Sequence, residues 1–199
     1  MNLRLAAAVG AFQETPIFRS VRDAHSGAVL RTPASNRRPV RIPLEIDNIW
    51  EWARPPHYSS RRSCGFGSPS SGLAKAYGPA GGTVCRVLIR PPAQVIQLRS
   101  IPDARYHPDV RTLRAVLRAH EQRARSEHGD IGVLRAHYLS REQTHALLAG
   151  LPDLLTDLRE SVRYWHDCCS WDTLNPETID SCGEIAFSAP HGYVLDPTL

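Results

Sequence analysis

The sequence predicts a single domain of the α+β class, spanning residues 1–199, with a helical insertion over about 108–166. Segments typical of short strands occupy the first hundred residues and return at 184–188 and 192–195. The stretch between them instead has apolar residues at helical spacing. Strands that are grouped apart from helices favour α+β over an alternating α/β fold. A chain of 199 residues is long enough to bury one full hydrophobic core.

The N-terminal third alternates short regular segments with proline-rich loops. A strand is expected over 16–21, followed by a turn and a short extended piece through 28–30. Residues 33–43 contain three prolines and are expected to form a loop. The segment 44–52 carries two tryptophans and is expected to be a short helix or strand, before a second polar loop at 54–62.

A serine-rich segment follows, and its pattern changes from strand to turn to helix. Residues 63–78 predict a short strand, a turn and a helix of small residues, which the glycines and proline of 78–82 end. Strands are then expected over 83–90 and 94–98, with a proline pair between them.

The central third is predicted to be helical. Apolar residues recur at helical spacing from Asp109 to about Glu127, with Gly129 as the expected stop. A second helix is expected over 140–148, because Ser140 can open a capping box. Pro152 is expected to begin a third helix that carries a leucine stripe.

Composition is ordinary for a soluble globular protein, with 42% hydrophobic and 22% charged residues. No window approaches the roughly 18 apolar residues of a membrane span, so no membrane partner is expected. The apolar run at 3–12 is short and lacks a small-x-small cleavage site, so an ordinary first helix is expected there rather than a signal peptide.

The basic residues are unusual in kind, because 23 of the 24 are arginines and the only lysine is Lys75. They are scattered and the net charge is only +4, so a nucleic-acid partner is not expected. A GC-rich genome would produce this bias. So would selection against lysine in a protein that acts inside a eukaryotic host, where lysines are ubiquitinated. Both interpretations indicate a bacterial protein.

The cysteines and the familiar sequence motifs exclude several functional classes. Five cysteines occur without a CxxC pair, and adjacent Cys168 and Cys169 are poorly spaced for tetrahedral ligation, so reduced thiols and no metal are expected. The phosphate-binding GxxxxGK[ST], a GxGxxG in a βαβ context, HExxH and a serine nucleophile elbow are all absent from the sequence.

Three separated segments place an arginine, a serine and a glutamate on predicted strands: Phe18-Arg19-Ser20, Phe66-Gly67-Ser68-Pro69-Ser70 and Gly183-Glu184-Ile185-Ala186-Phe187. An arginine fork pairs well with phosphate oxygens. A carboxylate near a ribose stabilises the positive charge that develops when the leaving group departs. A serine on a rigid strand can orient that carboxylate. These are the groups that transfer of an ADP-ribosyl unit requires.

Together, and in this order, the three segments resemble the NAD-dependent mono-ADP-ribosyltransferase toxins of the Arg-Ser-Glu type. Residues 65–98 are also similar to the diphtheria-toxin branch, although Arg19 stands where that branch has histidine and Gly67 where it has tyrosine. The resemblance covers residues 15–100 and 180–196. It implies an ADP-ribosyltransferase-like fold, with two small, packed, mostly antiparallel sheets.

The resemblance also implies a role for each residue. Arg19 would bind the phosphates and nicotinamide ribose of NAD, Ser68 would orient Glu184, and Glu184 would bind the ribose 2′-hydroxyl and stabilise the cation. The expected NAD-binding set is completed by Ser20, Gly67, Ser70 and Tyr77, with Phe66, Tyr58 and Trp50 as candidates for stacking on nicotinamide.

The function implied is that of a secreted bacterial effector or toxin that uses NAD as co-substrate and acts in the host cytoplasm, with the bacterial cytoplasm as the alternative location. The acceptor would be a host signalling protein, for which small GTPases, actin and ubiquitin are the family's habitual targets. Cys182 stands where arginine-modifying members have Glu or Gln, so the acceptor residue stays open. An NAD glycohydrolase on the same fold and a non-catalytic interaction module are the alternatives.

Overall fold

The computed structural model describes residues 17–22, 30–123, 128–170 and 179–197. The predicted N-terminal helix and most of the extended piece expected over 28–30 lie outside these residues. The described chain contains six α-helices and two small antiparallel sheets, which confirms the α+β class. None of the described helices is long and apolar enough to cross a membrane.

The chain divides into two compact units. The sheet unit takes the described residues of Met1–Asn36, Arg61–Asp103 and Cys168–Leu199. The helical unit takes Arg37–Ser60 and Ala104–Asp167. The helical part is therefore larger than the insertion expected over about 108–166, because residues 37–60 also belong to it.

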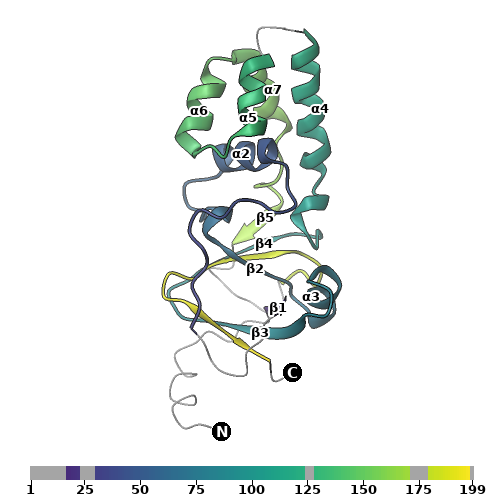
Figure 1. Cartoon of the computed structure of the whole chain (residues 1–199), viewed down its shortest axis with the longest axis vertical. Coiled ribbons are helices and arrows are strands. Elements are labelled where there is room, and N and C mark those ends of the chain that lie inside the picture. The colour runs from purple at the N-terminus through teal and green to yellow at the C-terminus, as the bar shows by residue number, and fades with distance from the viewer. Residues whose placement is uncertain (1–16, 23–29, 124–127, 171–178, 198–199) are drawn as a thin grey trace. The chain divides into compact units, whose positions relative to one another are not determined.

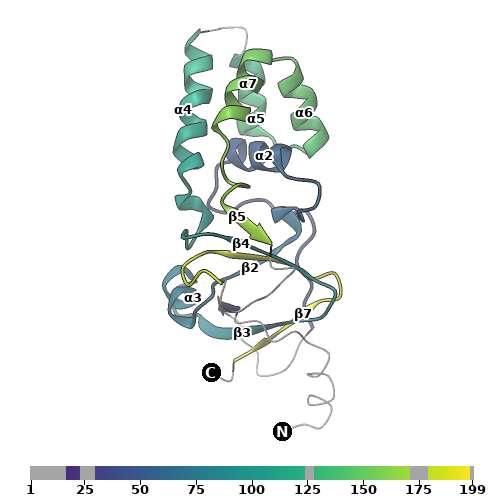
Figure 2. The same ribbon diagram turned by 180° about the vertical axis from the view of Figure 1, so that it is seen from behind.

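Both sheets lie in the sheet unit (Figure 1). One has the order β1-β3-β7 and the other the order β2-β6-β4-β5, with every neighbouring pair antiparallel. The bounds are β1 Phe18–Val21, β2 Gly65–Gly67, β3 Thr83–Ile89, β4 Gln94–Leu98, β5 Cys168–Ser170, β6 Ile185–Ser188 and β7 Tyr193–Asp196. The helix α3 (Ser71–Tyr77) packs against β1 and β3, as Figures 1 and 2 show from opposite sides.

The core of this unit draws on both sheets. Phe187 of β6 and Tyr193 of β7 meet edge to face, with ring centroids 5.1 Å apart. Around them lie the buried side chains of Ile17, Cys85, Val87, Ile89, Val95, Ile185 and Leu195. Burial raises the pKa of the Cys85 thiol, so this cysteine is an apolar core residue rather than a nucleophile.

In the helical unit, α2 lies across one end of the other four helices (Figures 1 and 2). The bounds are α2 Leu44–Ala53, α4 Pro108–Arg123, α5 His128–Ala136, α6 Arg141–Ala149 and α7 Pro152–Ser161. Asn48 of α2 is fully buried and donates to the carbonyls of Leu134 and His137, while its own carbonyl accepts from Leu139 N. It thereby satisfies backbone groups that the end of α5 leaves without partners.

Several local predictions are confirmed, and two need correction. Residues 44–53 are a helix, and Ser140 with Gln143 forms the capping box expected at the start of α6. The stop predicted at Gly129 is wrong, because Gly129 lies in the first turn of α5, a helix that the prediction omits. The three-residue strand β5 was also not predicted, since two cysteines and a serine give no recognisable strand pattern.

Candidate functional site

The register of the strands brings the three motif segments of the sheet unit together. Phe18 and Ser68 form a bridge through two backbone hydrogen bonds of 2.8 Å, which joins β1 to the end of β2. On its other side β2 pairs with β6, and Gly67 opposite Ile185 is the last pair of that ladder. The next residues are Ser68 and Glu184, and Arg19 follows Phe18. Arg19, Ser68 and Glu184 thus lie on adjoining strand positions although they are far apart in sequence.

Glu184 is held by both its backbone and its side chain. Its N–H donates to Ile101 O at 2.7 Å, and its carbonyl accepts from Leu98 N at 2.9 Å. Its Oε1 accepts a 2.9 Å hydrogen bond from Arg61 Nη1, in an ion pair whose side chains are only 13% and 10% exposed. A charge-assisted hydrogen bond at this depth restricts the direction in which the carboxylate points.

The same guanidinium also covers Phe66. Arg61 Cζ lies 4.6 Å from the centroid of the Phe66 ring, a cation–π distance. Arg61 begins a short 3-10 helix, Arg61–Ser63, directly before β2. One face of the ring predicted to stack on nicotinamide therefore has an arginine against it.

The loop before Glu184 is fixed by the buried side chain of Gln97. Gln97 Nε2 donates to the carbonyls of Asp180 and Gly183 at 2.6 and 3.2 Å, and Gln97 Oε1 accepts from Asp180 N at 3.0 Å. The Gln97 amide thus makes hydrogen bonds to the backbone of Asp180 and Gly183, which belong to no strand and have no ladder to supply them.

Asp180 fixes the loop from within. Its carboxylate accepts hydrogen bonds from Cys182 N and from the backbone and hydroxyl of Ser100. Burial alone would raise the pKa of Asp180, but hydrogen bonds from Cys182, Ser100 and Gly183 outweigh it and hold the pKa below its usual value. The carboxylate is therefore ionised at neutral pH, and its hydrogen bonds to the backbone order the approach to Glu184.

Gly183 permits the closest approach in this loop. A Cβ built on it would lie 2.0 Å from Leu98 O, a backbone atom that cannot move aside without displacing β4. Gly67 is similar, since its Cβ would lie 2.6 Å from Ile17 Cγ2 and 2.8 Å from Phe18 O. Glycine at these two positions lets the segment that carries Ser68 approach β1, and the segment that carries Glu184 approach β4.

Arg19 is half-buried on β1, opposite Cys85 of β3. Its Nη1 donates to Tyr193 Oη at 3.2 Å. Tyr193 is 6% exposed and belongs to the core of the sheet unit, so its hydroxyl holds the Arg19 guanidinium in a defined position. The fork of Arg19 has further N–H groups with which to contact an anion.

Three other NAD-binding candidates of the sheet unit, Ser70, Ser20 and Tyr77, lie on or beside α3. Ser70 is the N-cap of α3, where its hydroxyl accepts from Leu73 N at 3.3 Å. The hydroxyl of Ser20 is buried beside Gly78 and Gly82 and has no hydrogen-bond partner among the described residues. Tyr77 is the last residue of α3 and is half-buried. The expected role of Ser68 in orienting Glu184 stays a prediction.

Trp50 and Tyr58 belong to the helical unit instead. Trp50 is 1% exposed, stacks on Tyr164 at 4.2 Å, and donates from Nε1 to Asp109. Its ring is covered by the core, which removes it from the candidates for stacking on a ligand. Tyr58 is half-buried and stacks on Trp165 at 5.6 Å.

Arg61, Gln97 and Asp180 were missed by the sequence reasoning. Arg61 lies in a polar loop with several other arginines, so nothing in the pattern singles it out. Gln97 was assigned only to a strand, although a buried amide among apolar residues is a signal that it bonds to the backbone.

Among the described residues, no three His, Cys, Asp or Glu side chains gather as a metal site. Comparison of the chain with protein-family models, with curated proteins and with solved structures finds no match.

Proposed function

We propose that this chain is an NAD-dependent mono-ADP-ribosyltransferase of the Arg-Ser-Glu type. The observation that carries the proposal is the strand register: the Phe18–Ser68 bridge and the Gly67–Ile185 pair put Arg19, Ser68 and Glu184 at adjoining positions. The sequence motifs by themselves do not require this proximity. Transfer of ADP-ribose needs these three side chains around one NAD molecule, and the proximity of their backbone positions supports that arrangement.

The donor set at these positions fits NAD. Arg19 provides a guanidinium for the diphosphate, Ser68 a hydroxyl and Glu184 a carboxylate for the nicotinamide ribose. NAD, when bound, supplies the ADP-ribosyl group, with nicotinamide as the leaving group. The carboxylate of Glu184 then accepts from the ribose 2′-hydroxyl and stabilises the positive charge that develops on the ribose.

Arg61 acts in this scheme as a positioning residue. Its hydrogen bond to Glu184 Oε1 restricts the direction of the carboxylate that is proposed to contact the ribose. Holding the carboxylate before the substrate arrives lowers the reorganisation needed at the moment of bond cleavage.

The acceptor is the least constrained part of the proposal. Cys182 is exposed, and it occupies the position that is Glu or Gln in arginine-modifying relatives of the proposed family. We therefore favour an acceptor side chain other than arginine, on a host protein such as a small GTPase, actin or ubiquitin, with the chain acting as a bacterial effector. The same observation supports water as the acceptor, which would make the enzyme an NAD glycohydrolase.

Labelled NAD separates these outcomes. Purified protein is incubated with adenine-labelled NAD and a eukaryotic lysate, beside Glu184→Ala and the surface control Glu160→Ala. Labelled protein bands that appear with the wild type and Glu160→Ala, but not with Glu184→Ala, would support transfer. Free ADP-ribose without a labelled band would support hydrolysis. Intact NAD with all three folded proteins would contradict both.

A further inference from the structure

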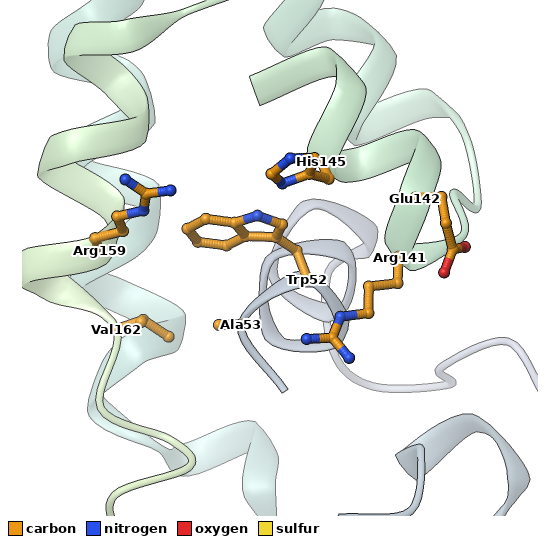
Figure 3. Close-up of a pocket in the computed structure, with 7 residues that line it drawn as sticks. All are labelled: Trp52, Ala53, Arg141, Glu142, His145, Arg159 and Val162. Atoms are coloured by element: carbon orange, nitrogen blue, oxygen red, sulfur yellow. The ribbon is translucent and has the colours of Figure 1, made fainter. Parts of the chain in front are cut away.

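The helical unit contains a pocket of its own, which the proposed NAD chemistry does not use. It has a volume of about 660 Å³ and is formed by α2, α6, α7 and the residue after α7 (Figure 3). Its lining is Trp52, Ala53, Arg141, Glu142, His145, Arg159 and Val162. This volume falls within the range of pockets that hold small organic ligands.

The pocket gathers two arginines and a histidine. Arg141 and His145 come from successive turns of α6, and Arg159 comes from α7. None of the three makes a hydrogen bond or an ion pair with a described residue. Other arginines of the helical unit are paired, as in Arg54–Glu51, Arg114–Glu45 and Arg135–Glu121. The lining therefore holds two arginines and one histidine against a single acidic residue, Glu142.

The one acidic residue of the lining does not neutralise the cluster. Glu142 Oε2 accepts a 2.9 Å hydrogen bond from Ser140 Oγ, and in Figure 3 its carboxylate points away from Trp52. The hydrogen bonds from its own backbone N–H and from the Ser140 hydroxyl lower the pKa of Glu142. Weaker charge interactions with Arg141 and Arg54 lower this pKa further, so Glu142 offsets part of the positive charge near Arg141.

Trp52 supplies a second, independent indication of a ligand. Trp52 is 9% exposed, and in Figure 3 its ring lies between Arg159 and Arg141, with His145 beside it. Trp50 Nε1 donates to Asp109, and Trp165 Nε1 donates to Trp50 O. Trp52 Nε1 alone of these three has no hydrogen-bond partner among the described residues. The Trp52 N–H is therefore available to a ligand in the pocket.

We propose that this pocket binds a small organic phosphate monoester. Two guanidinium forks, an imidazole and an indole N–H offer more donors than a carboxylate can use, and they match the oxygens of a phosphate. The phosphate contacts the guanidiniums of the lining, and the organic body covers the apolar surface of Trp52, Ala53 and Val162. The site is separate from the residues proposed to bind NAD.

Isothermal titration of the full chain tests the site with phenyl phosphate, inorganic phosphate and phenol. We expect phenyl phosphate to bind more tightly than inorganic phosphate, and phenol not to bind, because both the anion and the body contribute. Arg141→Gln and Arg159→Gln should each weaken binding of phenyl phosphate by about tenfold or more. Arg118→Gln is the matched control, since Arg118 is exposed on α4 outside the pocket, and should bind as the wild type does.

Trp52→Phe keeps a ring but removes the N–H, and should weaken binding measurably while the protein stays folded. The proposal is overturned if the folded wild type does not bind phenyl phosphate at millimolar concentration. It is also overturned if Arg118→Gln loses as much affinity as Arg141→Gln, which would mean diffuse attraction to an arginine-rich surface. Binding of a phosphotyrosine peptide without binding of phenyl phosphate would likewise reject a small-molecule ligand.

Discussion

Arg61 Nη1 donates a 2.9 Å hydrogen bond to Glu184 Oε1, across 123 positions of sequence. The contact joins the segment before β2 to the residue directly before β6. Because the pair is largely shielded from solvent, its geometry is better defined than that of a surface ion pair. The glutamate on which the proposed chemistry depends is therefore held in place before any substrate binds.

Removing the Arg61 guanidinium should impair turnover more than substrate binding. In Arg61→Gln the carboxylate of Glu184 loses its fixed direction, so kcat for nicotinamide release should fall by about tenfold or more, with a smaller change in KM. The free energy of unfolding should fall by about 1.5–3 kcal/mol, because a charged hydrogen bond is lost from a shielded site. Arg61→Lys restores charge without the fork and should recover part of kcat. An unchanged kcat in Arg61→Gln would remove Arg61 from the mechanism.

Gly183 should be intolerant of even one methyl group. Gly183→Ala places a Cβ against Leu98 O, so the loop or β4 must shift, at a cost of about 1–3 kcal/mol in unfolding free energy. Gly72→Ala in α3 is the matched control, because no atom lies within 4 Å of its added Cβ. The control should be neutral or stabilising, since alanine favours helix over glycine. Chemical denaturation of both variants measures this, and equal losses would argue against the tight packing of Gly183.

The hydrogen bonds of Asp180 should make the stability of the loop depend on pH. Its pKa in the folded protein lies below that of the unfolded chain, so its stabilisation is complete above the unfolded pKa of about 3.9. It is lost as the pH falls through the lower, folded value. The difference in unfolding free energy between wild type and Asp180→Asn should therefore be constant from about pH 5 to 7 and shrink below about pH 4. A difference that stays constant down to pH 3 would show that the carboxylate does not titrate in this way.

Asp109 should be the most sensitive polar residue of the helical unit. It is 1% exposed and accepts from Trp50 Nε1, Arg163 N and Tyr164 N at 2.9–3.0 Å. Asp109→Ala leaves these donors buried without an acceptor and should cost about 3 kcal/mol or more. Asp130→Ala, an exposed aspartate on α5, is the control and should change stability by about 0.5 kcal/mol or less. Equal effects on thermal unfolding would contradict the role assigned to Asp109.

Local signals in the sequence predicted much of the fold because they act over a few residues. The capping box of Ser140 and Gln143 depends on groups three positions apart, and α6 begins where these groups stand. The helix 44–53 was ambiguous, because its buried acidic and amide residues interrupt the apolar pattern and find their partners elsewhere in the helical unit. Asn48, bonded to the end of α5, is the clearest case.

The candidate site was predictable in its motif residues but not in its supports. Arg19, Ser68 and Glu184 stood out by residue type and order. Arg61, Gln97 and Tyr193 act through contacts across 80 or more positions, which no local pattern encodes. The division into two units was also not visible, because residues 37–60 join the helices through packing rather than through sequence proximity.

The most direct test of the proposed activity is the rate of nicotinamide release from NAD by the wild type, Glu184→Gln and the surface control Glu160→Gln. Glutamine keeps the shape of the side chain and removes its charge, so the fold should persist while stabilisation of the ribose cation is lost. We expect release by the wild type and by Glu160→Gln at the same rate, and a fall of about 100-fold or more in Glu184→Gln. Equal release by Glu184→Gln, or no release by the folded wild type in the presence of lysate, would contradict the assignment.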